Sequence, residues 1–253
     1  MNWRRLVLFA ALCIAVPLEA QRGRRNRFTE PGDNPPYDGR VTFVRLRYET
    51  GMDQDFGRFG GGDVPWSHDY PRGERNFTQI LSELTTIRVR TAESVVMRVT
   101  DPELGRYPVA YMAEPGFWRP NDVEVAAMRT YLAKGGFVMF DDFRGNHWFN
   151  LETQMRRVLP ALRFVRIDGT HPIFDAFYRV PNPEELSSYG GTIPTFWALF
   201  EDNDPKRRML ALAYRDGDLS EYWEFSGQGF APVDLENEAY KLGINFLVYS
   251  LSR

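Results

Sequence analysis

The chain has 253 residues, of which 43% are hydrophobic, 15% aromatic and 26% charged. This composition is ordinary for a globular protein and excludes a multi-span membrane protein and long-range disorder. A formal net charge of −3 argues against nucleic acid as the main partner, and one cysteine with three histidines excludes a disulfide framework and a cysteine-rich zinc site.

The first 20 residues have the three parts of a secretory signal peptide. Arg4 and Arg5 precede an apolar run over residues 6–16, and cleavage is expected after Ala20. The run is shorter than the ~20 residues of a spanning helix, so we expect an exported protein, periplasmic or secreted, with no membrane span beyond the signal. The alternative is an uncleaved signal-anchor that tethers the chain to the inner membrane, because positive charge directly after the run opposes export. That charge comes from Arg22, Arg24, Arg25 and Arg27.

Residues 21–40 are rich in Arg, Pro and Asn and predict a disordered linker. No repeat or second linker follows, so a single domain is expected over residues 41–253. Its hydrophobic patterns predict eleven helices and strands and one glycine-rich surface loop. In chain order these are a strand at 41–48, the loop at 51–62, a helix at 74–86, strands at 95–100 and 108–112, a helix at 121–134, a strand at 136–140, a helix at 151–159, strands at 162–167, 196–200 and 209–214, and a helix at 235–251.

The alternation of strands and helices predicts an open, mostly parallel α/β sheet with helices on both faces. Residues 136–140 are apolar on both faces, which is typical of a central strand in such a sheet. Asn121 with Glu124 three residues later predicts a capping box at the start of the helix expected at 121–134.

The end of the central strand is the first candidate site, because ligands of open α/β sheets bind beyond the carboxyl ends of the strands. Asp141 and Asp142 lie there, and two adjacent carboxylates leaving a buried strand need a compensating charge. Arg144 and His147 are the nearest candidates. Neighbouring strand residues point to opposite faces, so one aspartate can face the cleft while the other caps a helix or loop. A purely structural role of the pair stays open.

A second candidate site is the loop before the helix at 74–86, which contains His68, Asp69 and Arg72. An arginine at a helix N-terminus is suited to clamp a carboxylate or phosphate of a ligand. The alternative is a loop latch in which Arg72 pairs with Asp69 or Glu74.

The histidines His68, His147 and His171 offer the right atoms for zinc or iron, together with Asp141 or Asp142. Their spacing matches no known metal motif, so no metal site is predicted and the cofactor stays unknown. Further along the chain, Asp216 and Asp218 are interpreted as turn formers.

Several segments in order resemble a bacterial family known as domain of unknown function 4159. The likeness extends from about residue 41 to residue 253 and implies a flavodoxin-like sheet of the class I glutamine amidotransferase-like superfamily, with no established activity. The segments that carry it are Phe43 to Tyr48, Asn76-Phe77 with Leu84-Thr85, Asp101-Pro102 before Tyr107 to Met112, Leu132 to Gly136 running into Asp141-Asp142, and His171 to Phe174.

The resemblance also shows what this chain lacks. Amidotransferases of that superfamily carry a nucleophilic cysteine directly after the strand equivalent to residues 137–140, and a His–Glu pair near the C-terminus. Here Asp141 and Asp142 stand at that elbow, the one cysteine is Cys13 inside the predicted signal, and no histidine follows His171. A cysteine nucleophile with a histidine base is therefore chemically unavailable.

We therefore predict an exported, non-amidotransferase ligand-binding or protein-interaction module. Its ligand would be a small molecule or carbohydrate, or its partner an envelope protein. The alternative is a hydrolase, with or without metal assistance, acting on a carbohydrate or cell-envelope substrate through Asp141 or Asp142 and His147. A third hypothesis, a structural subunit of a membrane-associated complex, rests on the signal-anchor alone. The predicted ligand-binding residues are Arg72, Asp141, Asp142, Arg144 and His147.

Overall fold

The structure is a computed structural model that describes residues 31–50, 64–186 and 192–252. The predicted signal peptide, residues 21–30 of the linker and the loop at 51–62 lie outside the described residues. Within the described part of the chain, none of the helices combines the length and the apolar character needed to cross a membrane.

Seven strands form one sheet in the order β2-β1-β3-β4-β7-β6-β5. Among the described strands, only β6 runs antiparallel to its neighbours, and the other neighbouring pairs are parallel. This confirms the predicted open, mostly parallel α/β sheet of flavodoxin-like type. The strands are β1 (Val44–Leu46), β2 (Val95–Met97), β3 (Val109–Ala113), β4 (Phe137–Phe143), β5 (Val165–Ile167), β6 (Thr195–Phe200) and β7 (Met209–Arg215).

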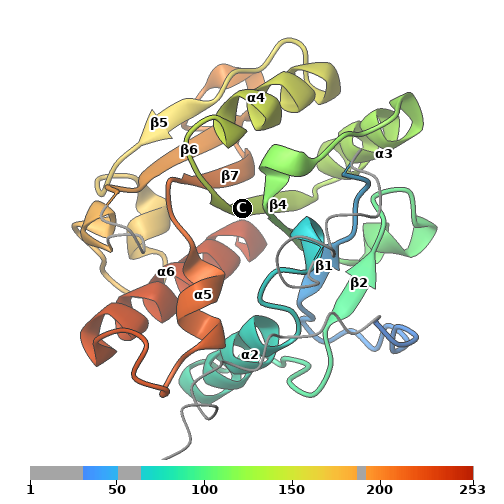
Figure 1. The fold of residues 1–253 in the computed structure, drawn as a ribbon. Coiled ribbons are helices and arrows are strands. Elements are labelled where there is room, and N and C mark those ends of the chain that lie inside the picture. Colours follow the sequence, from blue (N-terminus) through green and yellow to red (C-terminus); the bar gives the residue numbers. More distant parts are fainter. Residues whose placement is uncertain (1–30, 51–63, 187–191, 253) are drawn as a thin grey trace, which may run out of the picture.

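Helices cover both faces of the sheet, as Figure 1 shows, with α3 and α4 on one side and α2, α5 and α6 on the other. Strand β4 alternates accordingly. Phe137 and Met139 pack toward α2 and α6, while Val138 and Phe140 pack toward α3 and α4. The helices are α2 (Arg72–Leu84), α3 (Asp122–Ala133), α4 (His147–Val158), α5 (Leu219–Glu224) and α6 (Val233–Leu251).

The predicted capping box is confirmed at the start of α3. The Asn121 side chain accepts the backbone N–H groups of Val123 and Glu124, and the Glu124 carboxylate accepts that of Asn121 at 2.9 Å.

The bounds of other helices and strands differ from those that the sequence pattern predicts. Strand β4 continues to Phe143, beyond the predicted end at residue 140, and α4 begins at His147 rather than at residue 151. Helix α5 was not predicted, because six residues carry too little periodicity to be recognised.

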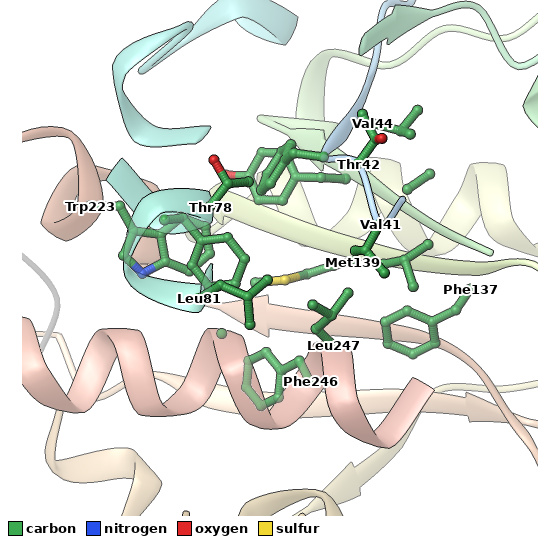
Figure 2. Close-up of a pocket in the computed structure, with 16 residues that line it drawn as sticks. Val41, Thr42, Val44, Thr78, Leu81, Phe137, Met139, Trp223, Phe246 and Leu247 are labelled. Carbon is green, nitrogen blue, oxygen red and sulfur yellow. The ribbon is translucent and has the colours of Figure 1, made fainter. Parts of the chain in front are cut away.

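A small apolar cavity lies between the sheet and helices α2 and α6 (Figure 2). Its volume is about 50 Å³, and its wall includes Met139 of β4, Leu81 of α2, Trp223 of α5 and Leu247 of α6. Ligand pockets usually measure ~300–1,000 Å³ and carry a few converging polar groups. This cavity is far smaller and nearly all apolar, so it is a gap in the core packing.

Candidate functional site

The candidate site lies where the direction of strand order reverses. From β1 the chain crosses to β2 at one edge, whereas from β3 it proceeds through α3 to β4 on the other side. Such a switch point leaves a crevice at the carboxyl ends of the strands. The segments that follow β1, β3, β4 and β7 meet there and bring together His68, Asp69, Glu114, Asp142 and Asp218.

Asp141 is fully buried and faces helix α5, not the cleft. Its carboxylate accepts the backbone N–H of Leu219 at 3.1 Å and of Ser220 at 3.2 Å, and the hydroxyl of Tyr111 at 3.0 Å. Burial and the neighbouring Asp142 raise the pKa of Asp141 to about 7. We predicted Asp141 as a ligand-binding residue. Its carboxylate oxygens instead accept hydrogen bonds from the first turn of α5, so they face that helix.

Asp142 lies at an irregularity near the end of β4. The register between β4 and β7 shifts between Phe140 and Phe143, and Asp142 has a left-handed backbone with φ of 55°. This turns its side chain to the cleft, where His68 Nδ1 donates to its Oδ2 at 2.5 Å. Burial alone would raise the pKa of Asp142, but the hydrogen bond and charge of His68, with Arg144 nearby, hold it below its ordinary value.

His68 forms the exposed side of this pair, with 39% of its side chain accessible. Burial lowers the pKa of His68, but Asp142 and Asp69 outweigh it and raise the pKa to about 10. The imidazole is therefore protonated at neutral pH. His147 was proposed as the histidine beside the aspartates, but it is His68 that pairs with Asp142, across 74 positions of the chain.

Asp69 and Asp218 complete the group of side chains around His68 and Asp142. Asp69 is fully buried, and its Oδ2 accepts the hydroxyl of Ser220 at 2.5 Å. Its Oδ1 has no hydrogen-bond donor among the described residues. Asp218 is the N-cap of α5, since its side chain accepts the N–H of Glu221 at 3.0 Å. Burial and Asp142 raise the pKa of Asp218 well above its ordinary value.

Polar atoms of His68, Asp69, Asp142 and Asp218 all lie within 4.8 Å of one another; we call these four residues the acidic cluster. Asp69 also belongs to a second such group with Glu221 and Glu224. The interpretation of Asp218 as only a turn former was therefore too narrow. Its spacing to Glu221 is a cap-like pattern that the sequence does contain, but nothing in the sequence pairs it with His68.

A buried arginine positions the loop that carries His68 and Asp69. Arg45 of β1 is fully buried, forms an ion pair with Glu74 of α2, and donates to the carbonyls of Trp66 at 3.0 Å and His68 at 2.8 Å. Its guanidinium also lies 4.9 Å from the ring centre of Tyr111. Sequence reasoning missed Arg45, because an arginine in an alternating strand is indistinguishable from an exposed one.

The two arginines predicted for ligand binding do lie at this edge of the sheet. Arg144 Nη2 is 3.8 Å from Asp218 Oδ2, and Arg72 Nη1 is 3.6 Å from Glu224 Oε1. Each has 42% of its side chain exposed. Neither predicted latch partner, Asp69 or Glu74, is the residue that Arg72 contacts in the structure. Both guanidiniums are therefore partly open to solvent while they lie close to a carboxylate.

The other two histidines do not join the acidic cluster. His147 begins α4 and packs on Phe117, with ring centres 4.6 Å apart, and burial lowers its pKa. His171 Nδ1 accepts the N–H of Ile173 at 3.2 Å, and its ring contacts Phe200 and Tyr249. The structure thus does not bring the three histidines together.

Carboxyl groups outnumber cationic side chains around the acidic cluster, and the pKa values of three nearby glutamates are raised. Burial and Asp142 raise the pKa of Glu114 to about 8. Burial and Asp69 raise the pKa values of Glu221 and Glu224 to about 7. A cluster of this kind in a cleft is a common mark of a functional site.

Replacing Glu114 with glutamine is expected to stabilise the protein at alkaline pH. The raised pKa means that the folded state favours the protonated carboxyl, so the wild type loses stability as pH rises from its unfolded pKa near 4.5 through about 8. At pH 9 Glu114→Gln should exceed the wild type by roughly 1–3 kcal/mol in free energy of unfolding, and at pH 4 it should not. Urea unfolding in the presence of a chelator measures this. Glu103→Gln, at an exposed site, should follow the wild type, and an equal pH dependence of Glu114→Gln and wild type would contradict the prediction.

Comparison with known proteins agrees with the resemblance seen in the sequence. No curated protein matches this chain. One family model matches residues 42–251, which is most of the chain and includes every residue of the acidic cluster. The protein therefore belongs to the family described as Domain of unknown function (DUF4159).

Proposed function

We propose that this protein is an exported ligand-binding domain without amidotransferase activity, and that a small polar ligand binds at the acidic cluster. The observation that carries the proposal is the convergence of His68, Asp69, Asp142 and Asp218 at the switch point of the sheet. Carboxylates and an imidazole in such a crevice suit the hydroxyl groups of a carbohydrate or the ammonium group of an amine. The apolar run at residues 6–16 supports export, and Cys13, the one cysteine, lies inside that run.

A hydrolase is the second candidate, and the contact between His68 and Asp142 favours it. Because His68 is protonated at neutral pH, an accessible imidazolium held by a buried carboxylate is suited to donate a proton to a leaving group as a general acid. In this version His68 takes the role first assigned to His147, and Asp142 orients it. A carbohydrate or cell-envelope substrate fits this site as it fits the binding proposal, and the partner stays a small molecule, a carbohydrate or an envelope protein.

A thermal-shift screen of sugars, amines and nucleotides tests the binding proposal. We expect at least one compound to raise the melting temperature of the wild type, and Asp142→Asn to abolish that shift while keeping the fold, because only a charge at the cleft is removed. Asp175→Asn, at an exposed aspartate of the short 3-10 helix Pro172–Asp175, is the matched control and should respond like the wild type. A shift that Asp142→Asn retains would place the ligand elsewhere.

Incubating the protein with the same compounds, and analysing whether each compound is cleaved, distinguishes the binding proposal from the hydrolase. If a compound that shifts the wild type is recovered unchanged, the protein binds it without hydrolysis. If it is cleaved, and His68→Gln binds but does not cleave it, then the hydrolase is the correct function.

A further inference from the structure

The acidic cluster holds more carboxyl groups than cationic side chains. Among the described residues, His68 is the only cationic side chain within 4.0 Å of a carboxylate oxygen of Asp69 or Asp142. Arg144 approaches Asp218 at 3.8 Å, and the guanidinium of Arg45 is already paired with Glu74. One imidazolium and one partly exposed guanidinium thus face three buried carboxyl groups. Burying unpaired carboxylates is costly, so such groups normally take up protons or bind cations.

A second observation concerns one member of the cluster, Asp69. Its side chain is completely inaccessible to solvent, yet Oδ1 has no hydrogen-bond donor among the described residues. Its other oxygen accepts from Ser220 and faces His68 Nδ1 at 3.8 Å. Buried polar atoms without a partner are rare in native proteins and each calls for a specific explanation. The carboxylate of Asp69 lies within reach of both groups of donor atoms around the cleft.

We propose that His68, Asp69, Asp142 and Asp218 bind a divalent first-row transition-metal ion, for which Zn²⁺ and Mn²⁺ are the suitable probes. Bonds of about 2.0–2.2 Å to nitrogen and oxygen place two ligands of one zinc ion at most ~4.4 Å apart. The donor atoms of the cluster lie within 4.8 Å of one another, so small side-chain adjustments bring them into this range. The ion would also supply the partner that Asp69 Oδ1 lacks.

The donor set decides which ion fits. Metal binding must displace the proton that His68 Nδ1 donates to Asp142. The imidazole nitrogen set free in this way, with three carboxylates, suits zinc, manganese or iron, whereas Mg²⁺ and Ca²⁺ prefer oxygen ligands alone. The affinity of such a site rises from Mn²⁺ to Zn²⁺. We therefore expect Zn²⁺ to bind more tightly than Mn²⁺, and both to bind more tightly than Mg²⁺. The inference rests on the proposed function for its location, since the ion would form part of the same ligand site.

Metal titration of the tag-free mature protein tests the inference. After dialysis against a chelator, calorimetry with Zn²⁺ and with Mn²⁺ should show about one ion per chain and a higher melting temperature. His68→Gln should weaken binding at least tenfold, because it removes the nitrogen ligand from a partly exposed position. His147→Gln is the matched control, since His147 lies at the same edge of the sheet outside the cluster, and it should bind like the wild type.

Asp69→Asn separates metal binding from a purely structural role of this aspartate. Asparagine can still accept from Ser220 but carries no charge, so the metal-free variant should be at least as stable as the metal-free wild type and should lose its response to Zn²⁺. The inference is overturned if the wild type binds neither ion, if His68→Gln binds as tightly as wild type, or if Asp69→Asn keeps the metal response.

Ligand and metal results separate the two proposals. If Zn²⁺ and Mn²⁺ do not bind, but a sugar or amine shifts the wild type and not Asp142→Asn, the metal inference fails and the proposed function stands. If metal binds at the cluster and the whole ligand screen is negative with and without it, the metal inference stands and the proposed function fails.

Discussion

Replacing Arg45 with methionine is expected to lower the free energy of unfolding by about 3–5 kcal/mol, the usual cost of removing one partner of a buried ion pair. Glu74 would remain fully buried without its cation, and the carbonyls of Trp66 and His68 would lose their donor. Because those carbonyls belong to the loop before α2, the variant should also weaken any response that depends on His68. Chemical denaturation followed by circular dichroism measures the first effect, and the Zn²⁺ titration measures the second.

Two further variants isolate the cause of that loss. Replacing Glu74 with glutamine together with Arg45→Met removes both charges, so the double variant should recover much of the stability of the single one. Arg98→Met breaks the ion pair with Glu49, in which 41% and 63% of the side chains are exposed, and should cost no more than about 1 kcal/mol. If Arg45→Met costs as little as Arg98→Met, the buried pair does not stabilise this fold.

Asp141→Ala is the second substitution expected to have a large effect, with a loss of about 2–4 kcal/mol in the free energy of unfolding. The change removes the acceptor of two N–H groups at the start of α5 and of the Tyr111 hydroxyl, and it leaves these donors buried. Since α5 carries Glu221 and Glu224 and follows Asp218, ligand and metal responses should be lost too.

Denaturation together with hydrogen exchange over residues 218–224 checks this expectation. Exchange there should accelerate in Asp141→Ala. Asp142→Asn should leave it unchanged, because the N–H groups of Leu219 and Ser220 donate to Asp141 and not to Asp142. Equal protection of α5 in both variants would show that Asp141 does not hold the helix.

The position of the candidate site could be predicted from the sequence, although its composition could not. The rule that ligands bind at the carboxyl ends of parallel strands selected Asp142 and Arg144, and the argument from a helix N-terminus selected Arg72. The structure places all three at that edge. Asp141 and Asp142 are adjacent, so only the left-handed turn at Asp142 decides which of them faces the cleft. A single backbone angle of this kind leaves no periodic signal in a sequence.

The site residues that the sequence did not predict were missed for one reason. Asp218 caps α5, and Glu221 and Glu224 lie within it, but α5 is too short for a helical pattern. Asp69, which lies near all three, is about 150 positions away in the chain. Contacts at that separation are produced by strand order, which a single sequence does not specify. The same holds for Arg45, whose burial depends on Glu74 arriving from α2.

Three residues around the cleft, Asp69, Glu114 and Asp142, have positive φ angles of 64°, 44° and 55°. For residues other than glycine this region is sparsely populated, and aspartate and asparagine enter it more readily than most. Substitution at Asp69 or Asp142 therefore changes two properties at once unless the new residue is asparagine. In a library that samples all amino acids at these two positions, β-branched residues should be the most strongly depleted, and asparagine and glycine should survive selection for folding. Selection for binding should then reject asparagine as well, so the difference between the two selections separates the demands of the backbone from those of the charge.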